Sequence, residues 1–500
     1  MTQRKINTTL LAAWLALVAG CGGGNPQQVP TGQAGVESPA PDDDSGSDGD
    51  VGDASDFGAD GEVADMDDAN AGDNREVVDM GDAKVGEDAS RSLAAWHEAQ
   101  GVGLGAVILR GDEVVLSKGW GMAREGEAIS SSTIFEIGSI SKLYTAALVH
   151  DAVERGELAW DTPVHEVLDD FVASDEVRVE HLIRQTSGLF NYTESRAFNE
   201  KRHEPWTPRA VRDIFESKPL LFEPGEAFAY SNSNYFLAGV ILERVTGKSF
   251  AELLRTRIAE PLGLKKTGMC DVDAVTTPRA SGHRRGADGL SVIPSRHMSS
   301  AYAAGGVCST PEEVAAFARA YYGGRWFSSQ ELETTPVFAS GLKSPYSWAT
   351  FVGRIAWRPT LSHGGSIYGF TSSLVRFPEQ DMTVVLLSNV FGLNLFSAIE
   401  PFAEIIAPVD REDVVWPTVS ESQAQAWAGV YAAPDLPPIE VIAEEEAGIS
   451  LLVQGASFGL KRVGEADFET EPQLLRLRFN ADILELEQNG VVFSLNKQPR

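Results

Sequence analysis

The chain has 500 residues, of which 43% are apolar and 23% charged, proportions typical of a soluble globular protein. Its formal net charge is −31, from 41 basic and 72 acidic side chains. This excess excludes a generic nucleic-acid binder, which needs a basic surface to replace the counterions on phosphate. Three cysteines are too few for a disulfide scaffold or a cysteine-based zinc module.

Residues 1–21 have the pattern of an export signal. Two basic residues precede an apolar run, 10–18, that is too short to remain in a bilayer as a transmembrane helix. The four residues 18–21, Val-Ala-Gly-Cys, resemble a bacterial lipobox, which implies cleavage before Cys21 and a lipid on that cysteine. Gly22 stands where aspartate usually signals retention in the inner membrane. We therefore expect a lipid-anchored protein of the bacterial cell envelope, held in the outer membrane.

Residues 22–90 carry 19 acidic and two basic side chains, so more than half of the net charge lies in this segment. It consists mainly of Gly, Asp, Ala, Pro and Ser, and Phe57 is its only aromatic residue. Such a composition buries too little apolar area to offset chain entropy, and like charges repel, so we expect a disordered, extended tether. Calcium binding is the alternative, but the regular ligand spacing of a calcium loop with its closing glutamate is missing.

Hydrophobic periodicity begins near Leu93, where the residues have helical spacing. Two apolar runs, 105–109 and 114–116, flank a Gly-Asp turn and predict a hairpin. The strand-like run 134–138 then leads into Ser139-Ile140-Ser141-Lys142, which is followed by apolar residues at helical spacing. This order predicts that Ser139 begins a buried helix and that Lys142 lies one turn later on the same face.

A serine followed three residues later by a lysine can perform nucleophilic catalysis. The serine hydroxyl needs a base to remove its proton, and a desolvated lysine can lose its charge and serve as that base. The helix start also offers backbone N–H groups to an oxyanion. Ser340 and Ser494 begin the other two Ser-x-x-Lys sequences, but the first runs into a proline and the second lies in a strand-like stretch.

Two further polar motifs follow along the chain. Tyr230-Ser231-Asn232 is the only Tyr-x-Asn sequence, and it lies in a polar loop that leads into the predicted helix 235–245. His363-Gly364-Gly365 precedes Ser366 and an apparent hairpin formed by 373–377 and 383–387. Because adjacent glycines let a strand pass close to a ligand, we expect Gly364 and Gly365 to bind substrate.

Together these motifs resemble the serine β-lactamase and penicillin-binding protein superfamily, in its class C β-lactamase-like branch. That branch includes D,D-carboxypeptidases, D-aminopeptidases and esterases. Ser139…Lys142, Tyr230-x-Asn232 and His363-Gly364-Gly365 stand in family order, and 182–189 and 304–310 also look like the family. The resemblance covers about residues 93–408 and implies an α+β fold, with an antiparallel sheet, flanking helices and an all-α region.

The resemblance also implies a role for each matching residue. Ser139 would be the acylated nucleophile and Lys142 its neutral amine partner. Tyr230, as phenol or phenolate, would relay the proton to the leaving group, and Asn232 would orient the substrate amide and the lysine. The backbone N–H groups of Ser139 and Ser366 would form the oxyanion hole, and water would hydrolyse the acyl-enzyme without a cofactor.

His363 departs from the β-lactamase pattern, in which a lysine usually opens the third motif. A histidine is largely neutral at pH 7, so it would hold a substrate carboxylate less well. This favours the peptidase, D-aminopeptidase and esterase relatives over efficient β-lactam hydrolysis. Neither His283 nor His297 has a metal-ligand partner at helical or strand spacing, so no catalytic metal is expected.

Composition changes after residue 408. We expect four regions: signal peptide 1–21, tether 22–90, catalytic domain 91–408 and a C-terminal all-β, barrel-like domain 419–500. Short β-like runs about ten residues apart, the first at Trp427–Tyr431, predict the last region. A structural or substrate-limiting accessory role is expected for it. Cys270 and Cys308 could pair in an oxidising envelope, a point that the sequence leaves open.

The expected function is that of an acyl-enzyme serine hydrolase of the cell envelope, acting on a D-amino-acid peptide or a small ester. A D,D-peptidase, a D-aminopeptidase and a carboxylesterase all fit this expectation. A class C-type β-lactamase and a non-catalytic envelope binding protein of the same fold are the alternatives. The sequence does not predict an oligomeric state.

Overall fold

The structure is a computed structural model, which describes residues 80–500 apart from several short gaps. The gaps are 272–278, 287–288, 295–296, 340–341, 357, 407–418, 434–435, 445–447, 454–455, 463–465, 472–475, 489–490 and 500. The predicted signal with Cys21, and the tether as far as residue 79, lie outside the described residues. Within the described part of the chain, none of the helices has the length and apolar character needed to cross a membrane.

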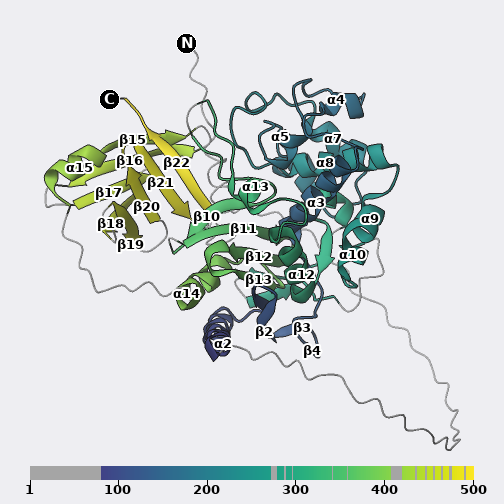
Figure 1. The fold of residues 1–500 in the computed structure, drawn as a ribbon, viewed down its shortest axis with the longest axis horizontal. Coiled ribbons are helices and arrows are strands. Elements are labelled where there is room, and N and C mark those ends of the chain that lie inside the picture. The colour runs from purple at the N-terminus through teal and green to yellow at the C-terminus, as the bar shows by residue number, and fades with distance from the viewer. Residues whose placement is uncertain are drawn as a thin grey trace, which may run out of the picture. The chain divides into compact units, whose positions relative to one another are not determined.

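A six-stranded antiparallel sheet forms the centre of the larger domain (Figure 1). Both predicted hairpins are present in it, because β1 pairs with β2 and β12 with β13. In spatial order its strands are β10 (Phe351–Ile355), β11 (Arg358–Ile367), β12 (Phe370–Phe377), β13 (Met382–Ser388), β1 (Leu104–Arg110) and β2 (Glu113–Trp120).

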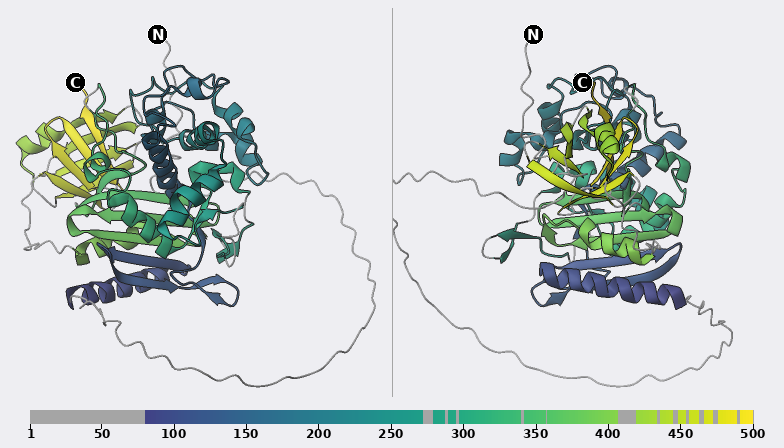
Figure 2. Two further views of the ribbon diagram at one scale, coloured as in Figure 1. Left: turned by 45° about the vertical axis from the view of Figure 1, so that its right-hand side comes forward. Right: turned by 90° about the vertical axis from the view of Figure 1, so that its left-hand side faces the viewer.

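The strands β12, β13 and β1 are buried on both faces, since their side chains alternate and both faces of the sheet are covered. Ala106 and Ile108 of β1 pack on one face with helices α2 (Met80–Gln100) and α14 (Phe396–Ile406). Figure 2 shows α2, in purple, beneath the sheet. Val107 of β1 and its neighbours pack on the other face, in the core formed with the helical region. The sheet is therefore fixed between two layers of helices.

The helical region lies between β2 and β10 in sequence. Its principal helices are α3 (Ser141–Glu154), α8 (Asn232–Thr246) and α12 (Pro311–Tyr322). Shorter elements complete it: η1 (Gly138–Ile140), α4 (Val164–Val167), α5 (Val179–Ile183), η2 (Tyr192–Glu194), α6 (Arg196–Glu200), α7 (Pro208–Phe215), α9 (Phe250–Leu253), η3 (Leu254–Ala259), α10 (Glu260–Leu262), η4 (Met298–Ser300), α11 (Tyr302–Gly305) and α13 (Ser329–Glu333). The short turn η5 (Pro378–Gln380) lies between β12 and β13.

Small strands join these helices to the sheet. The strand β9 (Val307–Ser309) pairs with β5 (Phe135–Glu136) and β6 (Gly268–Met269), and a disulfide joins Cys270 to Cys308. The remaining small strands are β3 (Met122–Arg124), β4 (Glu127–Ala128), β7 (His283–Gly286), β8 (Gly289–Val292) and β14 (Val390–Phe391). The pairing that the sequence leaves open is thus present, close to the segment that leads into Ser139.

Helix α2 corrects the expected end of the tether. It begins at Met80, whereas residues as far as 90 are predicted to be disordered. Val85 and Ala89 pack against the sheet, and Asp82 pairs with Arg110 at 2.6 Å. The Gly, Ala and Asp composition conceals this helix, since small residues suit both a flexible chain and a helix that lies close to a strand.

An eight-stranded closed barrel forms the C-terminal region, and its first strand pairs with its last. Tyr431, Phe468 and Leu495 are among the side chains of its packed core. Two strands, β18 and β19, are absent from the prediction, and Trp427 ends a helix instead of beginning a strand. The elements are α15 (Glu421–Trp427), β15 (Gly429–Ala433), β16 (Leu436–Glu444), β17 (Gly448–Val453), β18 (Ala456–Arg462), β19 (Asp467–Glu471), β20 (Arg476–Asn480), β21 (Ile483–Gln488) and β22 (Val491–Lys497).

Candidate active site

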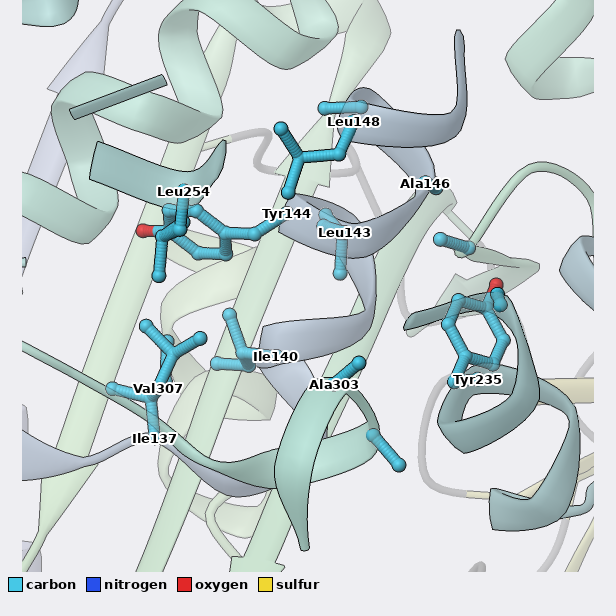
Figure 3. Packing of buried hydrophobic residues seen from close by; sticks show 14 of the residues in the cluster. Ile137, Ile140, Leu143, Tyr144, Ala146, Leu148, Tyr235, Leu254, Ala303 and Val307 are labelled. Atoms are coloured by element: carbon cyan, nitrogen blue, oxygen red, sulfur yellow. The ribbon is translucent and has the colours of Figure 1, made fainter. Parts of the chain in front are cut away.

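The turn η1 places Ser139 and Lys142 together at the start of α3. Gly138 has φ +51°, a left-handed conformation that favours glycine, and the chain then enters the helix. Ser139 remains partly exposed, whereas Lys142 is completely buried, and Lys142 Nζ lies 3.0 Å from Ser139 Oγ. Figure 3 shows apolar side chains of this segment, Ile140 among them, packed in the core. The predicted pair is therefore held by the hydrophobic core.

The burial of Lys142 favours a neutral amine. Nζ donates to Asn232 Oδ1 at 2.7 Å and to the Ala304 carbonyl at 2.8 Å, and neither oxygen can donate in return. Complete burial lowers the pKa of Lys142 well below the ordinary lysine value. A neutral amine has two N–H groups and one lone pair, so its lone pair is left for the hydroxyl hydrogen of Ser139.

Tyr230 lies in the loop before α8 and forms a hydrogen bond with the Ser139 side chain. Its ring centroid is 5.0 Å from Lys142 Nζ. Burial raises the pKa of the Tyr230 phenol, and the hydrogen bond with Ser139 offsets this rise only in part. Of the two forms that the sequence allows, the phenol is therefore the resting one, with a proton available to a leaving group.

Asn232 is oriented by residues that the sequence analysis does not single out. Asn191 Oδ1 accepts from the Asn232 backbone N–H at 3.1 Å and from Nδ2 at 3.3 Å. Thr193 Oγ1 accepts from the same Nδ2 at 3.2 Å. With Nδ2 engaged in this way, Asn232 Oδ1 faces Lys142. Asn191 follows the family-like stretch 182–189 closely, which is the one sequence signal that could have pointed to it.

Gln185 holds the loop that carries Tyr230 through two hydrogen bonds. It is buried, its φ is +59°, and its carbonyl accepts from the Ala229 N–H at 3.0 Å. Its side-chain oxygen accepts from the Ser231 N–H at 2.9 Å, so Gln185 holds both neighbours of Tyr230. Gln185 belongs to the family-like stretch 182–189, but no motif in the sequence assigns it a role.

His363 is buried on β11 and turned toward another aromatic residue. Its Nε2 lies 3.0 Å from the Tyr346 hydroxyl, and its Nδ1 lies 2.6 Å from the Gly364 carbonyl. Burial lowers the pKa of His363 to about 3. His363 is therefore neutral at physiological pH, accepting a hydrogen bond from Tyr346, and supplies no positive charge for a substrate carboxylate.

The two glycines after His363 differ in their surroundings. A Cβ added at Gly365 would lie closer than 3.0 Å to the Ile137 carbonyl oxygen, whereas one at Gly364 would meet nothing closer than 3.7 Å. A Cβ at Gly138 would lie 3.0 Å from the Ser366 backbone nitrogen. Strand β11 thus passes directly against the Ser139 turn, with the Ser366 N–H next to it, as the predicted oxyanion hole requires. The Ser366 side chain is exposed.

No group of three or more His, Cys, Asp or Glu side chains arranged to hold a metal ion occurs in the part of the chain that the structure describes. The groups that the described residues bring together at Ser139 are its hydroxyl, a neutral amine, a phenol and two backbone N–H groups. This set can transfer an acyl group to Ser139 and move the protons that the transfer requires.

A family model described as Beta-lactamase matches residues 87–435. The penicillin-binding protein 4* of Bacillus subtilis is 26% identical over 60% of this chain and 70% of its own length. The teichoic acid D-alanine hydrolase of Staphylococcus aureus is 26% identical over 57% of this chain and 70% of its own length. The unguisins hydrolase of Aspergillus campestris is 26% identical over 61% of this chain, and the matched part makes up 60% of that relative's length.

Solved structures show the same fold. The D-amino acid amidase of Ochrobactrum anthropi, complexed with D-phenylalanine, has a TM-score of 0.56 and 24% identity over 64% of this chain and 99% of its own. The D-stereospecific amidohydrolase of a Streptomyces species has a TM-score of 0.54 and 23% identity over 64% of this chain and 98% of its own. The expected α+β fold with an all-β C-terminal region is thus confirmed. Because the family model matches well over half of the chain, the protein belongs to the Beta-lactamase family and is a serine hydrolase of that family.

Proposed function

We propose that the protein hydrolyses an amide or peptide bond formed by a D-amino acid, through an acyl-enzyme on Ser139. The observation that carries this proposal is the position of Lys142, which is completely buried, with Nζ 3.0 Å from Ser139 Oγ and acceptors at its other two contacts. The substrate class is supported by the names of similar proteins, which include a D-alanine hydrolase and a D-amino acid amidase.

Acylation begins when Lys142 Nζ takes the proton of Ser139 and Ser139 Oγ attacks the substrate carbonyl carbon. The oxyanion that forms lies against the N–H groups of Ser139 and Ser366. As the tetrahedral intermediate collapses, Tyr230 gives its phenolic proton to the leaving nitrogen. The Lys142 ammonium formed in the first step stabilises the resulting phenolate, because Nζ is 5.0 Å from the Tyr230 ring centroid.

Deacylation reverses the proton movements. A water molecule attacks the acyl carbon while the Tyr230 phenolate takes one of its protons. When the second tetrahedral intermediate collapses, the Lys142 ammonium returns its proton to Ser139 Oγ. The sum of both halves is the addition of one water to the scissile bond, and the enzyme regains its resting protonation.

A carboxylesterase is the second candidate, because a neutral ester needs no positive charge at the third motif and His363 supplies none. The third motif thus lacks the cation that opens it in β-lactamases, which disfavours a class C-type β-lactamase. A non-catalytic binding protein would have no need of the Lys142 hydrogen bonds that prepare Ser139.

We also propose that the enzyme is exported and anchored through a lipid on Cys21. The support is the pattern of residues 1–21, which combines a basic start, an apolar run and a lipobox-like ending. Fractionation of cells that express the full chain should place it with the membranes, and Cys21→Ala should release it. Wild-type protein in the soluble fraction would contradict the anchor.

The catalytic proposal is tested on purified protein with a fluorophosphonate probe and intact-mass measurement. A single adduct is expected in the wild type and none in Ser139→Ala; an adduct that persists in the variant would overturn the assignment of Ser139. Turnover of D-amino acid amides, D-Ala-D-Ala peptides, p-nitrophenyl esters and nitrocefin then separates the candidates. Hydrolysis of esters alone would favour the esterase.

A further inference from the structure

A substrate carboxylate finds no cation among the motif residues of this site. His363 is neutral and faces Tyr346, and Lys142 is fully engaged by Ser139, Asn232 and the Ala304 carbonyl. If the substrate carries a negative charge near the scissile bond, its counter-charge must come from a neighbouring segment of the chain.

The segment that begins at Thr193 connects two sides of the site. Thr193 accepts a hydrogen bond from Asn232 Nδ2, and helix α6 follows it directly. Arg202, two residues after α6, then lies over the ring of Tyr368, with its guanidinium carbon 4.6 Å from the ring centroid. Tyr368 is in the turn between β11 and β12, two residues after Ser366. Arg202 therefore lies beside the tip of the hairpin that carries the predicted oxyanion hole.

The guanidinium of Arg202 lies over the Tyr368 ring and has N–H groups available for a ligand. A guanidinium that stacks on an aromatic ring keeps its N–H groups directed outward in its own plane, which is the geometry that binds a carboxylate with two hydrogen bonds. Its Nε lies 3.5 Å from His203 Nε2, and no carboxylate of the described residues pairs with it. Arg196 of α6, by contrast, pairs with Glu200 at 2.7 Å.

We propose that Arg202 binds a carboxylate of the substrate, with Tyr368 as the ring that orients it. The inference rests on the proposed function and makes it more specific, because it selects substrates with a free carboxylate, such as a peptide ending in a D-amino acid, over neutral amides and esters. Arg202 is then a specificity-determining residue, separate from the proton transfers at Ser139.

The test compares two substrates that differ only in this charge: a blocked D-Ala-D-Ala peptide and its C-terminal amide. For Arg202→Gln we expect KM for the carboxylate peptide to rise about 10-fold to 100-fold, the range for losing a charged hydrogen bond, with little change in kcat. The amide should be hydrolysed as by the wild type. Arg196→Gln removes a positive charge from the same segment and should alter neither substrate.

The outcomes separate this inference from the proposed function. Reaction of Ser139 with the fluorophosphonate at the wild-type rate in Arg202→Gln shows that the catalytic residues are intact. If that adduct forms, then equal losses on both peptides, no loss on either, or no preference of the wild type for the carboxylate peptide would overturn the role of Arg202 alone. If Ser139 forms no adduct in the wild type, the proposed function fails instead.

Discussion

A methyl group added at Gly365 should separate the two parts of the predicted oxyanion hole. The Cβ of an alanine there would lie about 0.8 Å inside the 3.0 Å limit that real Cβ atoms keep from the Ile137 carbonyl oxygen. Ile137 immediately precedes the Ser139 turn, so its backbone cannot give way without moving the nucleophile. Strand β11 must therefore move off the turn by most of an ångström and carry the Ser366 N–H with it. Loss of one oxyanion donor typically lowers kcat about 100-fold to 1,000-fold.

Gly364 provides the matched control, because its added Cβ would lie against Phe396 of α14 and not against the Ser139 turn, whatever its backbone contributes to substrate binding. It is the adjacent residue on the same strand, and an added Cβ there meets only ordinary contacts at 3.7 Å and beyond. Neither glycine has a positive φ, so alanine tests steric fit alone at both positions. Steady-state hydrolysis of a p-nitrophenyl ester should show the large kcat loss for Gly365→Ala and near wild-type kcat for Gly364→Ala, with thermal unfolding as the check on folding. A Gly365→Ala enzyme with wild-type kcat would refute this reasoning.

Three further predictions concern His363, Asn191 and the disulfide between Cys270 and Cys308. Because burial lowers the pKa of His363 to about 3, this histidine binds a proton below about pH 6.5 in the unfolded chain but stays neutral in the folded chain. The contribution of His363 should therefore lower the free energy of unfolding by up to about 1.4 kcal/mol for each pH unit below about 6.5. Chemical denaturation should give a flatter profile for His363→Gln, and equal profiles would contradict the buried neutral histidine. Asn191→Ala should lower kcat by freeing the Asn232 amide, and Asn191→Asp should recover part of the loss, since it keeps the accepting oxygen; equal kinetics in both variants would argue against this role. Cys308→Ser should cost about 3–4 kcal/mol of stability, the amount expected for a loop of 38 residues, measured against wild type with and without reductant.

The local elements of the fold follow from the sequence because they depend on local patterns. The β1–β2 and β12–β13 hairpins and the helix after Ser139 come from alternation, turn residues and helical spacing, and the structure contains all of them. The start of α2 and the strands β18 and β19 are missed because their residues are small or polar. Such residues form helix or strand here only through contacts with distant parts of the chain.

The supporting residues of the candidate site are harder to predict. Ser139, Lys142, Tyr230 and Asn232 belong to motifs, and the structure brings them together. Tyr346 belongs to no motif, yet its hydroxyl determines what His363 can do, and this contact joins the segment before β10 to β11 through tertiary packing alone. The protonation state of His363 does not follow from the sequence, because it depends on the burial of this side chain, which keeps it neutral.

The central claim, that Lys142 is a neutral base for Ser139, can be measured through the pH dependence of acylation. The rate of fluorophosphonate labelling should rise as one group titrates well below pH 10 and then reach a plateau, because burial lowers the pKa of Lys142. Lys142→Met should abolish the rise, and Tyr230→Phe should preserve it. A rate that in the wild type keeps increasing up to the ordinary lysine value of about 10.4 would show that Lys142 is an ammonium at neutral pH and would contradict the account.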